Sequence, residues 1–191
     1  MTFPELNYYQ QTFIRLSLKD EIIPSKEFED CRFEACSFNN CSFTGVKFLN
    51  CIFSECSISV IKAPGSRFLE TQFTRCKVIG FNWSKTNSIR GLTFNECQLN
   101  YSDFSYLKIP GTKMLGCEAK EVDFTEADLT GSDLQNTDFE NSRFYNTNLS
   151  GADLREARNF FIDIKNNSLK KTRFSFAGAV TLLNSLDIII E

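Results

Sequence analysis

The 191-residue sequence contains no histidine, only one tryptophan and two methionines, and no run of 18 or more apolar residues. Without histidine the chain lacks the commonest general base and the commonest metal ligand of proteins. The lack of a long apolar run argues against a transmembrane helix. The N-terminal MTFPELNYYQQTF has neither the basic region nor the apolar core of a signal peptide, so we expect a cytoplasmic protein.

Several functional motifs are also missing. The chain has no Gly-rich phosphate-binding loop and no G-x-S-x-G nucleophile motif. A formal net charge of −3 argues against a strongly basic nucleic-acid-binding domain. We therefore expect a protein that is not an enzyme, needs no cofactor or metal, contacts no membrane and does not bind nucleic acid directly.

Large apolar residues recur at every fifth position, a step that fits neither a helix nor a half-buried strand. Two residues before each of these centres stands a small residue, such as Cys31, Cys36 or Ser132. Two inward residues separated by one outward residue describe a short extended segment followed by a corner. Thr130-Gly131 and Ser150-Gly151 supply turn residues at such corners, so the sequence predicts a solenoid. The unbroken run of centres is Phe28, Phe33, Phe38, Phe43, Phe48 and Phe53.

The five-residue register slips by one position after Trp83 and resumes at Ile89. The slip has two interpretations. An extra residue relieves crowding around the tryptophan, or a bulge projects from the shaft and contacts a partner. In the second case the contact residues are Lys85, Thr86, Asn87 and Ser88.

All eight cysteines fall on the small inward position, and five of them would form one column along the solenoid. Stacked coils lie about 4.8 Å apart, further than the roughly 3.8 Å that a disulfide prefers between Cβ atoms. A linear stack also cannot provide the tetrahedral geometry of zinc. The pattern predicts free cysteines that act as small apolar fillers. The column contains Cys36, Cys56, Cys76, Cys97 and Cys117.

The two ends of the chain depart from the repeat. We expect residues 1–27 to form an N-terminal cap and first coil, residues 28–174 the repeat, and residues 175–191 a C-terminal segment. In that last segment Ser175 can cap a short helix, and residues 186–190 resemble an apolar strand. The segment is more apolar than a cap facing water should be, so it predicts a dimer interface. The expected interface residues are Phe176, Val180, Leu183, Leu186 and Ile188.

Charge is uneven along the chain. Residues 118–156 contain ten acidic and three basic side chains, a net charge of −7, whereas residues 57–117 have a net charge of +5. Six aspartates precede a centre residue, where Asp also serves local turn hydrogen bonding, so either charge or structure could require them. These residues are Asp103, Asp123, Asp128, Asp133, Asp138 and Asp153.

The stretch FTEADLTGSDLQNTDFENSRFYNTNLSGADLREA, residues 124–157, resembles the motif A(D/N)LXX of pentapeptide-repeat proteins. The resemblance implies an all-β, right-handed quadrilateral β-helix with four pentapeptides in each coil. With twenty residues per coil, Phe33, Phe53, Phe73 and Phe94 share one inward column. Trp83, Phe104, Phe124 and Phe144 share another.

The C-terminal sequence FFIDIKNNSLKKTRFSFAGAVTLLNSLDIIIE and the segment CKVIGFNW make the chain similar to the topoisomerase-protecting branch of that family. This branch includes the Qnr quinolone-resistance, albicidin-resistance and microcin-immunity proteins, and the albicidin-resistance type is the most similar. The resemblance implies a homodimer joined through its C-termini, a DNA-mimicking rod that binds DNA gyrase or topoisomerase IV and protects it from antibiotics or toxins. The long loops of the Qnr proteins are absent here.

On this interpretation four aspartates act as phosphate surrogates, and the slip residues Lys85 to Ser88 are further topoisomerase contacts. The alternative is a scaffold or adaptor solenoid that holds another protein on its flat faces. Charge concentrated beside the dimer end favours mimicry, whereas a monomer or charge cancelled face by face favours the adaptor. The four aspartates are Asp123, Asp128, Asp133 and Asp138.

Overall fold

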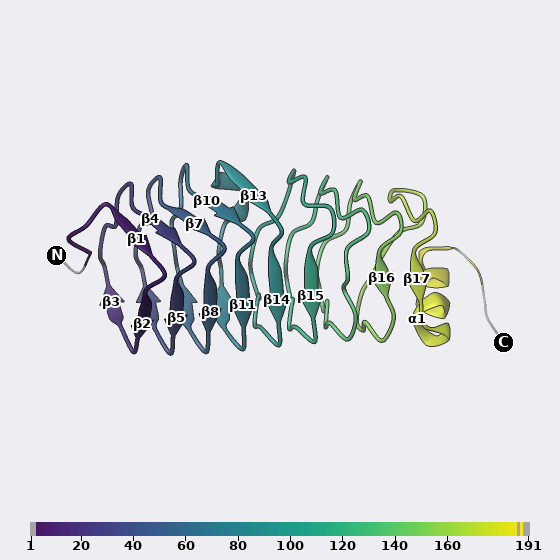
Figure 1. Ribbon diagram of the computed structural model, residues 1–191. Coiled ribbons are helices and arrows are strands. Elements are labelled where there is room, and N and C mark those ends of the chain that lie inside the picture. Colours follow the sequence, from purple (N-terminus) through teal and green to yellow (C-terminus); the bar gives the residue numbers. More distant parts are fainter. Residues whose placement is uncertain (1–2, 187, 189–191) are drawn as a thin grey trace.

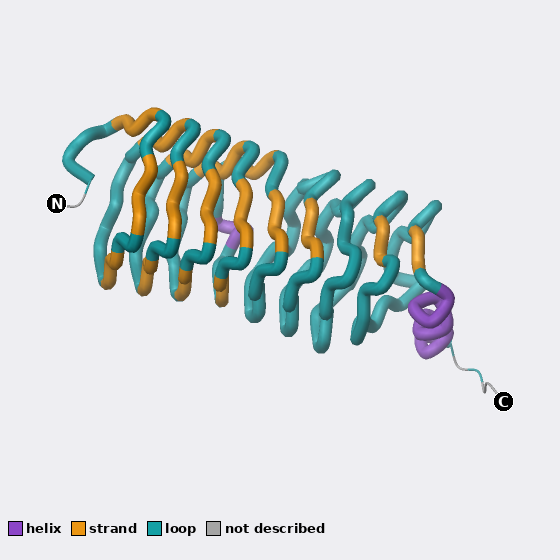
Figure 2. The backbone as a smooth tube through the Cα atoms, turned by 60° about the horizontal axis from the view of Figure 1, so that its bottom comes forward, coloured by secondary structure: helices purple, strands orange, loops and turns teal. Residues whose placement is uncertain are grey.

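The computed structural model describes residues 3–186 and residue 188, and it shows a rod of about eight stacked coils (Figures 1 and 2). The first described residues lie at one end of the rod and a short helix at the other. Neighbouring coils are joined by parallel backbone pairing, and the expected all-β quadrilateral β-helix is confirmed. No helix in the described part of the chain is long and apolar enough to cross a membrane.

Each coil has four sides, which we number as faces 1 to 4. Face 1 contains β1 (Asn7–Tyr9), β4 (Glu27–Glu29), β7 (Lys47–Leu49), β10 (Arg67–Leu69) and β13 (Ser88–Arg90). Face 2 contains β2 (Thr12–Ile14), β5 (Arg32–Glu34), β8 (Ile52–Ser54), β11 (Gln72–Thr74), β14 (Thr93–Asn95), β15 (Lys113–Leu115), β16 (Asp153–Leu154) and β17 (Arg173–Phe174). Face 3 contains β3 (Ser17–Lys19), β6 (Ser37–Asn39), β9 (Ser57–Ser59) and β12 (Lys77–Ile79). Along face 4, single bridges replace strands in the described residues, as between Asn82, Asp103, Asp123 and Arg143.

The aromatic columns lie where the sequence predicts them. Phe73 pairs with Phe53 twenty residues earlier and with Phe94 twenty-one residues later. Their rings are stacked, with centroid distances of 4.9 Å and 5.2 Å. The second column is stacked too, because Trp83 lies 5.6 Å from Phe104. The pairing keeps each ring directly above its predecessor, and this arrangement fills the core.

The register slip is a compact turn rather than a projecting loop. It forms the 3-10 helix η1 (Trp83–Lys85), and the hydroxyl of Thr86 donates a hydrogen bond to the Trp83 carbonyl oxygen over 2.7 Å. The backbone N–H of Asn87 still donates to Ser66 of the preceding coil. The turn therefore absorbs the extra residue while the coils on both sides stay in contact.

Crowding around Trp83 explains why the extra residue is placed here. The indole stacks on Phe81 at 4.0 Å, and the ring of Phe68 lies edge-on at 5.1 Å. Phe81 stands at a position where most coils place a small residue. Two large rings therefore occupy space that one ring and a small side chain fill elsewhere, and the backbone lengthens to accommodate them.

All eight cysteines are buried, as the sequence predicts. In the long column the backbone N–H of Cys36 donates to the sulfur of Cys56, and the Cys56 thiol donates to the carbonyl oxygen of Phe33. Burial raises the pKa of Cys51 and of Cys117 to about 12. These thiols therefore stay protonated at neutral pH and serve as fillers with weak hydrogen bonds.

The two ends of the rod are covered differently. Regular pairing begins at β1, and the ring of Phe3 packs edge-on against Tyr8, Phe13 and Phe28. At the other end Ser175 caps α1 (Phe176–Thr181), as predicted, and η2 (Leu182–Ser185) follows. The strand expected over residues 186–190 lies largely outside the described residues, and the three-part division of the chain stays a prediction.

Candidate functional site

The aspartates before the centre residues have a local structural role. The backbone N–H of Thr125 donates to Asp123 Oδ1 over 2.8 Å, and the N–H of Thr130 donates to Asp128 Oδ1 over 3.0 Å. Asn148 accepts in the same way from Ser150, over 3.1 Å. An amide therefore closes this turn as well as a carboxylate does, so the turn alone does not require charge. The same bond occurs at Asp103, Asp133, Asp138 and Asp153.

The structure does not bring the four predicted phosphate surrogates together. Their bridge partners place Asp128 on face 1, Asp133 on face 2, Asp138 on face 3 and Asp123 on face 4. Four pentapeptides complete one coil, so successive aspartates point to successive sides of the rod. A partner that docks on one side therefore meets one or two of them.

On face 3 two acidic side chains, Asp138 and Glu140, are neutralised within the protein. Asp138 is buried and lies 3.4 Å from Arg158 and 3.7 Å from Lys120, which also pairs with Glu140 over 2.8 Å. Burial raises the pKa of Asp138, but hydrogen bonds from Asn159 and the backbone of Glu140, together with these cations, lower it overall. Asp138 is thus a fixed, internally paired charge.

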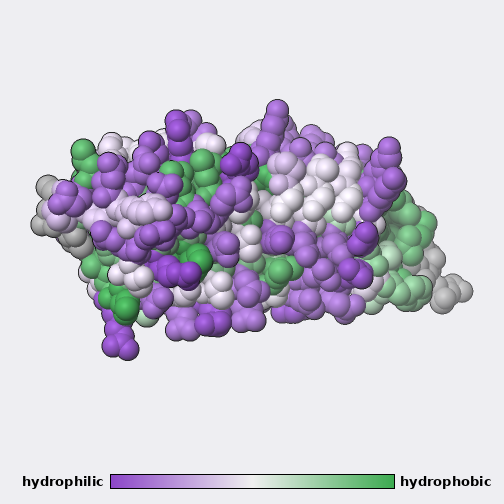
Figure 3. All heavy atoms as spheres, viewed as in Figure 1, coloured by the Kyte–Doolittle hydropathy of each residue, from purple (hydrophilic) through white to green (hydrophobic). Residues whose placement is uncertain are grey.

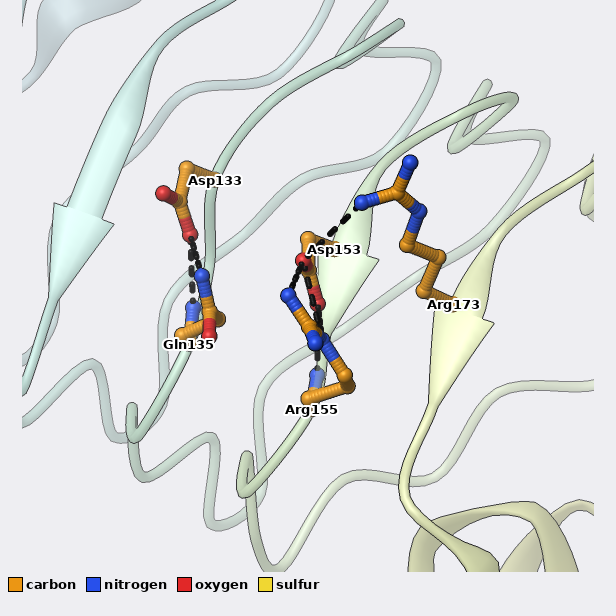
Figure 4. A network of polar contacts seen from close by, with 5 residues as sticks. All are labelled: Asp133, Gln135, Asp153, Arg155 and Arg173. Carbon is orange, nitrogen blue, oxygen red and sulfur yellow. Dashed lines mark hydrogen bonds and ion pairs between the residues drawn. The ribbon is translucent and has the colours of Figure 1, made fainter.

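On face 2 Asp153 is compensated in the same manner (Figure 4). The carboxylate of Asp153 lies between Arg155, at 2.7 Å, and Arg173, at 3.8 Å. The hydrogen bonds from Arg155 lower the pKa of Asp153, so this carboxylate stays ionised. Asp133 accepts from the backbone and side chain of Gln135, at 3.4 Å and 3.0 Å. On face 2 the charge of Asp153 is therefore compensated, whereas Asp133 keeps its charge for a partner.

Face 4 differs from faces 2 and 3 in that four of its carboxylates are not paired with cations in the described part of the chain. Asp103, Glu121, Asp123 and Glu126 have no basic side chain within ion-pair distance among the residues that the structure describes. A hollow of about 430 Å³ is lined by Glu121, Asp123 and Arg143. Glu121 and Glu126 could not be singled out from the sequence because they stand at corners, outside the inward positions that the five-residue pattern defines. The one sequence feature that marks these two glutamates is their position twenty residues after Tyr101 and Tyr106.

The slip residues lie at the corner between face 4 and face 1. Lys85, Asn87 and Ser88 are exposed, whereas Thr86 is partly buried. A hollow of about 250 Å³ beside them is lined by Thr86, Asn87, Ser88 and Lys108. Of the four aspartates, Asp123 and Asp128 lie on the two faces that meet at this corner.

The C-terminal end carries an exposed apolar surface around α1 (Figure 3). The side chain of Phe176 is 88% exposed, and those of Val180 and Ile188 are also exposed. Leu183 and Leu186 are partly buried. The five residues predicted at a dimer interface therefore gather at one end of the rod, next to the acidic coils.

The chain is similar to known repeat proteins in sequence and in fold. The family description "pentapeptide repeat region" matches residues 26–104, and "pentapeptide repeats (8 copies)" matches residues 123–158. A trypsin-treated form of QnrB1, a plasmid-mediated fluoroquinolone resistance protein, is similar with a TM-score of 0.67 and 17% identity, over 97% of this chain and 99% of that chain. Full-length QnrB1 gives a TM-score of 0.64 and 18% identity, over 93% and 100%. No curated protein sequence matches.

The likeness to QnrB1 shows a shared fold over nearly the whole chain. The two family matches together cover more than half of the residues. They coincide with the coils whose five-residue register fills the core with stacked rings. The chain therefore belongs to the pentapeptide-repeat family.

Proposed function

We propose that this protein is a cytoplasmic, non-enzymatic homodimer that binds a bacterial type II topoisomerase, DNA gyrase or topoisomerase IV, and protects it from inhibitors such as fluoroquinolones. The observation that carries the proposal is the position of the acidic coils, residues 118–156, directly beside the exposed apolar end. The fold shared with a fluoroquinolone resistance protein supports it.

A dimer joined at the C-terminal ends would bring the acidic coils of both protomers together. With about eight coils per protomer, each rising about 4.8 Å, the dimer would be on the order of 80 Å long. Its centre would be negative and its arms, from residues 57–117, positive. Such a segment suits an enzyme surface that binds DNA phosphates through Lys and Arg.

The residues that we propose as topoisomerase contacts have different roles. Asp123, Asp128 and Asp133 supply surface charge, and the slip residues 85–88 lie at the corner between the faces of the first two. Asp138 contributes to folding, because it is buried and paired. The direct test is binding of the wild-type dimer to purified gyrase and topoisomerase IV. Affinity should fall at least tenfold between 50 and 200 mM salt; no binding at low salt would refute the proposal.

The second candidate is an adaptor that holds another protein on a flat face. The cancelled charges on faces 2 and 3 favour it, because a DNA mimic would be negative on every side. The uncompensated face 4 and the apolar end favour topoisomerase binding. Retention of another protein together with no binding to either topoisomerase would select the adaptor.

The dimer interface is tested by Phe176→Asp. Because Phe176 is exposed in the protomer, the charge should leave the fold intact and only oppose association. The expected result by light scattering is the 21.9 kDa monomer, whereas the wild type gives twice that mass. Leu183→Asp should act in the same direction but less cleanly, since Leu183 is partly buried.

The matched control for this test is Val60→Asp, which charges an exposed apolar side chain far from the C-terminal end. This variant should remain dimeric. A wild-type protein that is already monomeric would refute the interface.

A further inference from the structure

Three of the five tyrosines are exposed on face 4 or at its corners. The side chains of Tyr101 and Tyr106 are 61% and 67% exposed, and Tyr145 is exposed two coils further on. Tyr101 and Tyr106 both adopt left-handed backbone conformations, with φ values of 63° and 61°. Glycine or asparagine adopts this conformation at less cost than an aromatic residue. Neither the corner geometry nor burial therefore accounts for an aromatic ring at these two positions.

Uncompensated carboxylates lie beside these rings. Glu121 follows Tyr101 by one coil at the same corner, and Glu126 follows Tyr106 at the other corner. Asp123 lies on the face between the two glutamates. Within residues 101–106, 121–126 and 141–146 there are four carboxylates, and Arg143 is the one basic residue.

The face is also hollowed. Beside the hollow of about 430 Å³ at Glu121 and Asp123, a second hollow of about 590 Å³ is lined by Thr125, Tyr145, Phe161 and Asp163. The hydroxyl oxygen of Thr125 is buried and has no hydrogen-bond partner among the described residues. Each hollow has the size of a large side chain and offers at least one carboxylate, and Arg143 lines both.

We propose that face 4, from Tyr101 to Asp163, docks a basic segment of a partner protein through arginine side chains. An arginine guanidinium pairs with carboxylates through a planar fork and stacks on tyrosine rings, whereas a lysine ammonium supplies only a point charge. The negative charge of the face excludes nucleic acid and opposes a second copy of the same face. The inference rests on the proposed function only for the identity of the partner, a topoisomerase.

The test compares two triple variants that remove the same charge from different sides of the rod. The face 4 variant is E121Q/D123N/E126Q. The control, E96Q/E118Q/E156Q, neutralises three glutamates on other sides of the rod that form no ion pair with the described residues. A labelled deca-arginine peptide is the probe, and its affinity for the full-length protein is measured by fluorescence anisotropy.

The expected result is at least a tenfold loss of deca-arginine affinity in the face 4 variant and less than a twofold loss in the control. Y101S/Y106S should weaken deca-arginine more than deca-lysine, because stacking favours the guanidinium. Equal losses in the two charge variants, or no binding of the peptide by the wild type, would overturn the proposal.

The same variants distinguish this inference from the proposed function when gyrase replaces the peptide. If the wild type binds gyrase and both charge variants lose affinity equally, face 4 is not the docking face although the function stands. If the wild type binds deca-arginine through face 4 but binds no topoisomerase, the surface stands and the proposed function fails.

Discussion

Replacing Phe73 by alanine is expected to lower the free energy of unfolding by about 3–5 kcal/mol. The side chain is 1% exposed and stacks between Phe53 and Phe94, with Trp83 edge-on at 6.0 Å. Backbone pairing on both sides holds the neighbouring coils at a fixed spacing, so they cannot collapse into the cavity. Urea unfolding should therefore show the full loss of unfolding free energy that the lost contacts cause.

The control for this prediction is Phe161→Ala, which deletes the same atoms from a side chain that is 60% exposed. Its expected cost is below about 1 kcal/mol. If Phe73→Ala costs no more than Phe161→Ala, the aromatic column does not stabilise the fold in the way described.

The sequence predicted the core because one geometric rule governs every coil. A five-residue unit with two inward positions leaves room for one large and one small side chain, so Phe73 and Cys76 could be placed without a structure. A separate rule, the preference for serine at a helix N-cap, predicted the cap at Ser175 correctly. Phe81 was missed because it breaks the rule, with a large ring at a position that is usually small.

The functional surface was harder to predict because charges were counted along the chain rather than around the rod. Residues twenty apart lie side by side, so Lys120 meets Glu140, and Arg158 meets Asp138. These pairs neutralise charge on face 3. The net charge summed over residues 118–156 cannot show this pairing. The total of −7 for residues 118–156 was correct as a count, but the unpaired carboxylates are concentrated on face 4, with Asp128 and Asp133 on faces 1 and 2.

The second large effect is expected from neutralising the acidic coils as a whole. Adding D128N, D133N and E156Q to the face 4 variant raises the formal net charge from −3 to +3 and spares the paired Asp138 and Asp153. The protein should fold and dimerise normally, because the asparagines can close the turns, but it should no longer protect gyrase. The substitutions are E121Q, D123N, E126Q, D128N, D133N and E156Q.

The matched control makes the same charge change in the N-terminal coils, far from the apolar end. It should protect gyrase as well as the wild type does, because electrostatic contacts depend on where the charge lies and not only on net charge. If both six-fold variants lose protection equally, net charge rather than the acidic segment is responsible. The control substitutions are E5Q, D20N, E21Q, E29Q, D30N and E34Q.

The central claim is that this solenoid shields a type II topoisomerase from its inhibitors. The most direct measurement is supercoiling of relaxed plasmid by purified gyrase, at a fluoroquinolone concentration that blocks the reaction, with increasing wild-type protein. The account predicts that the wild-type dimer restores supercoiling and that the variant with neutralised acidic coils does not. Failure of the wild type to restore supercoiling at any concentration at which it is dimeric would contradict the account.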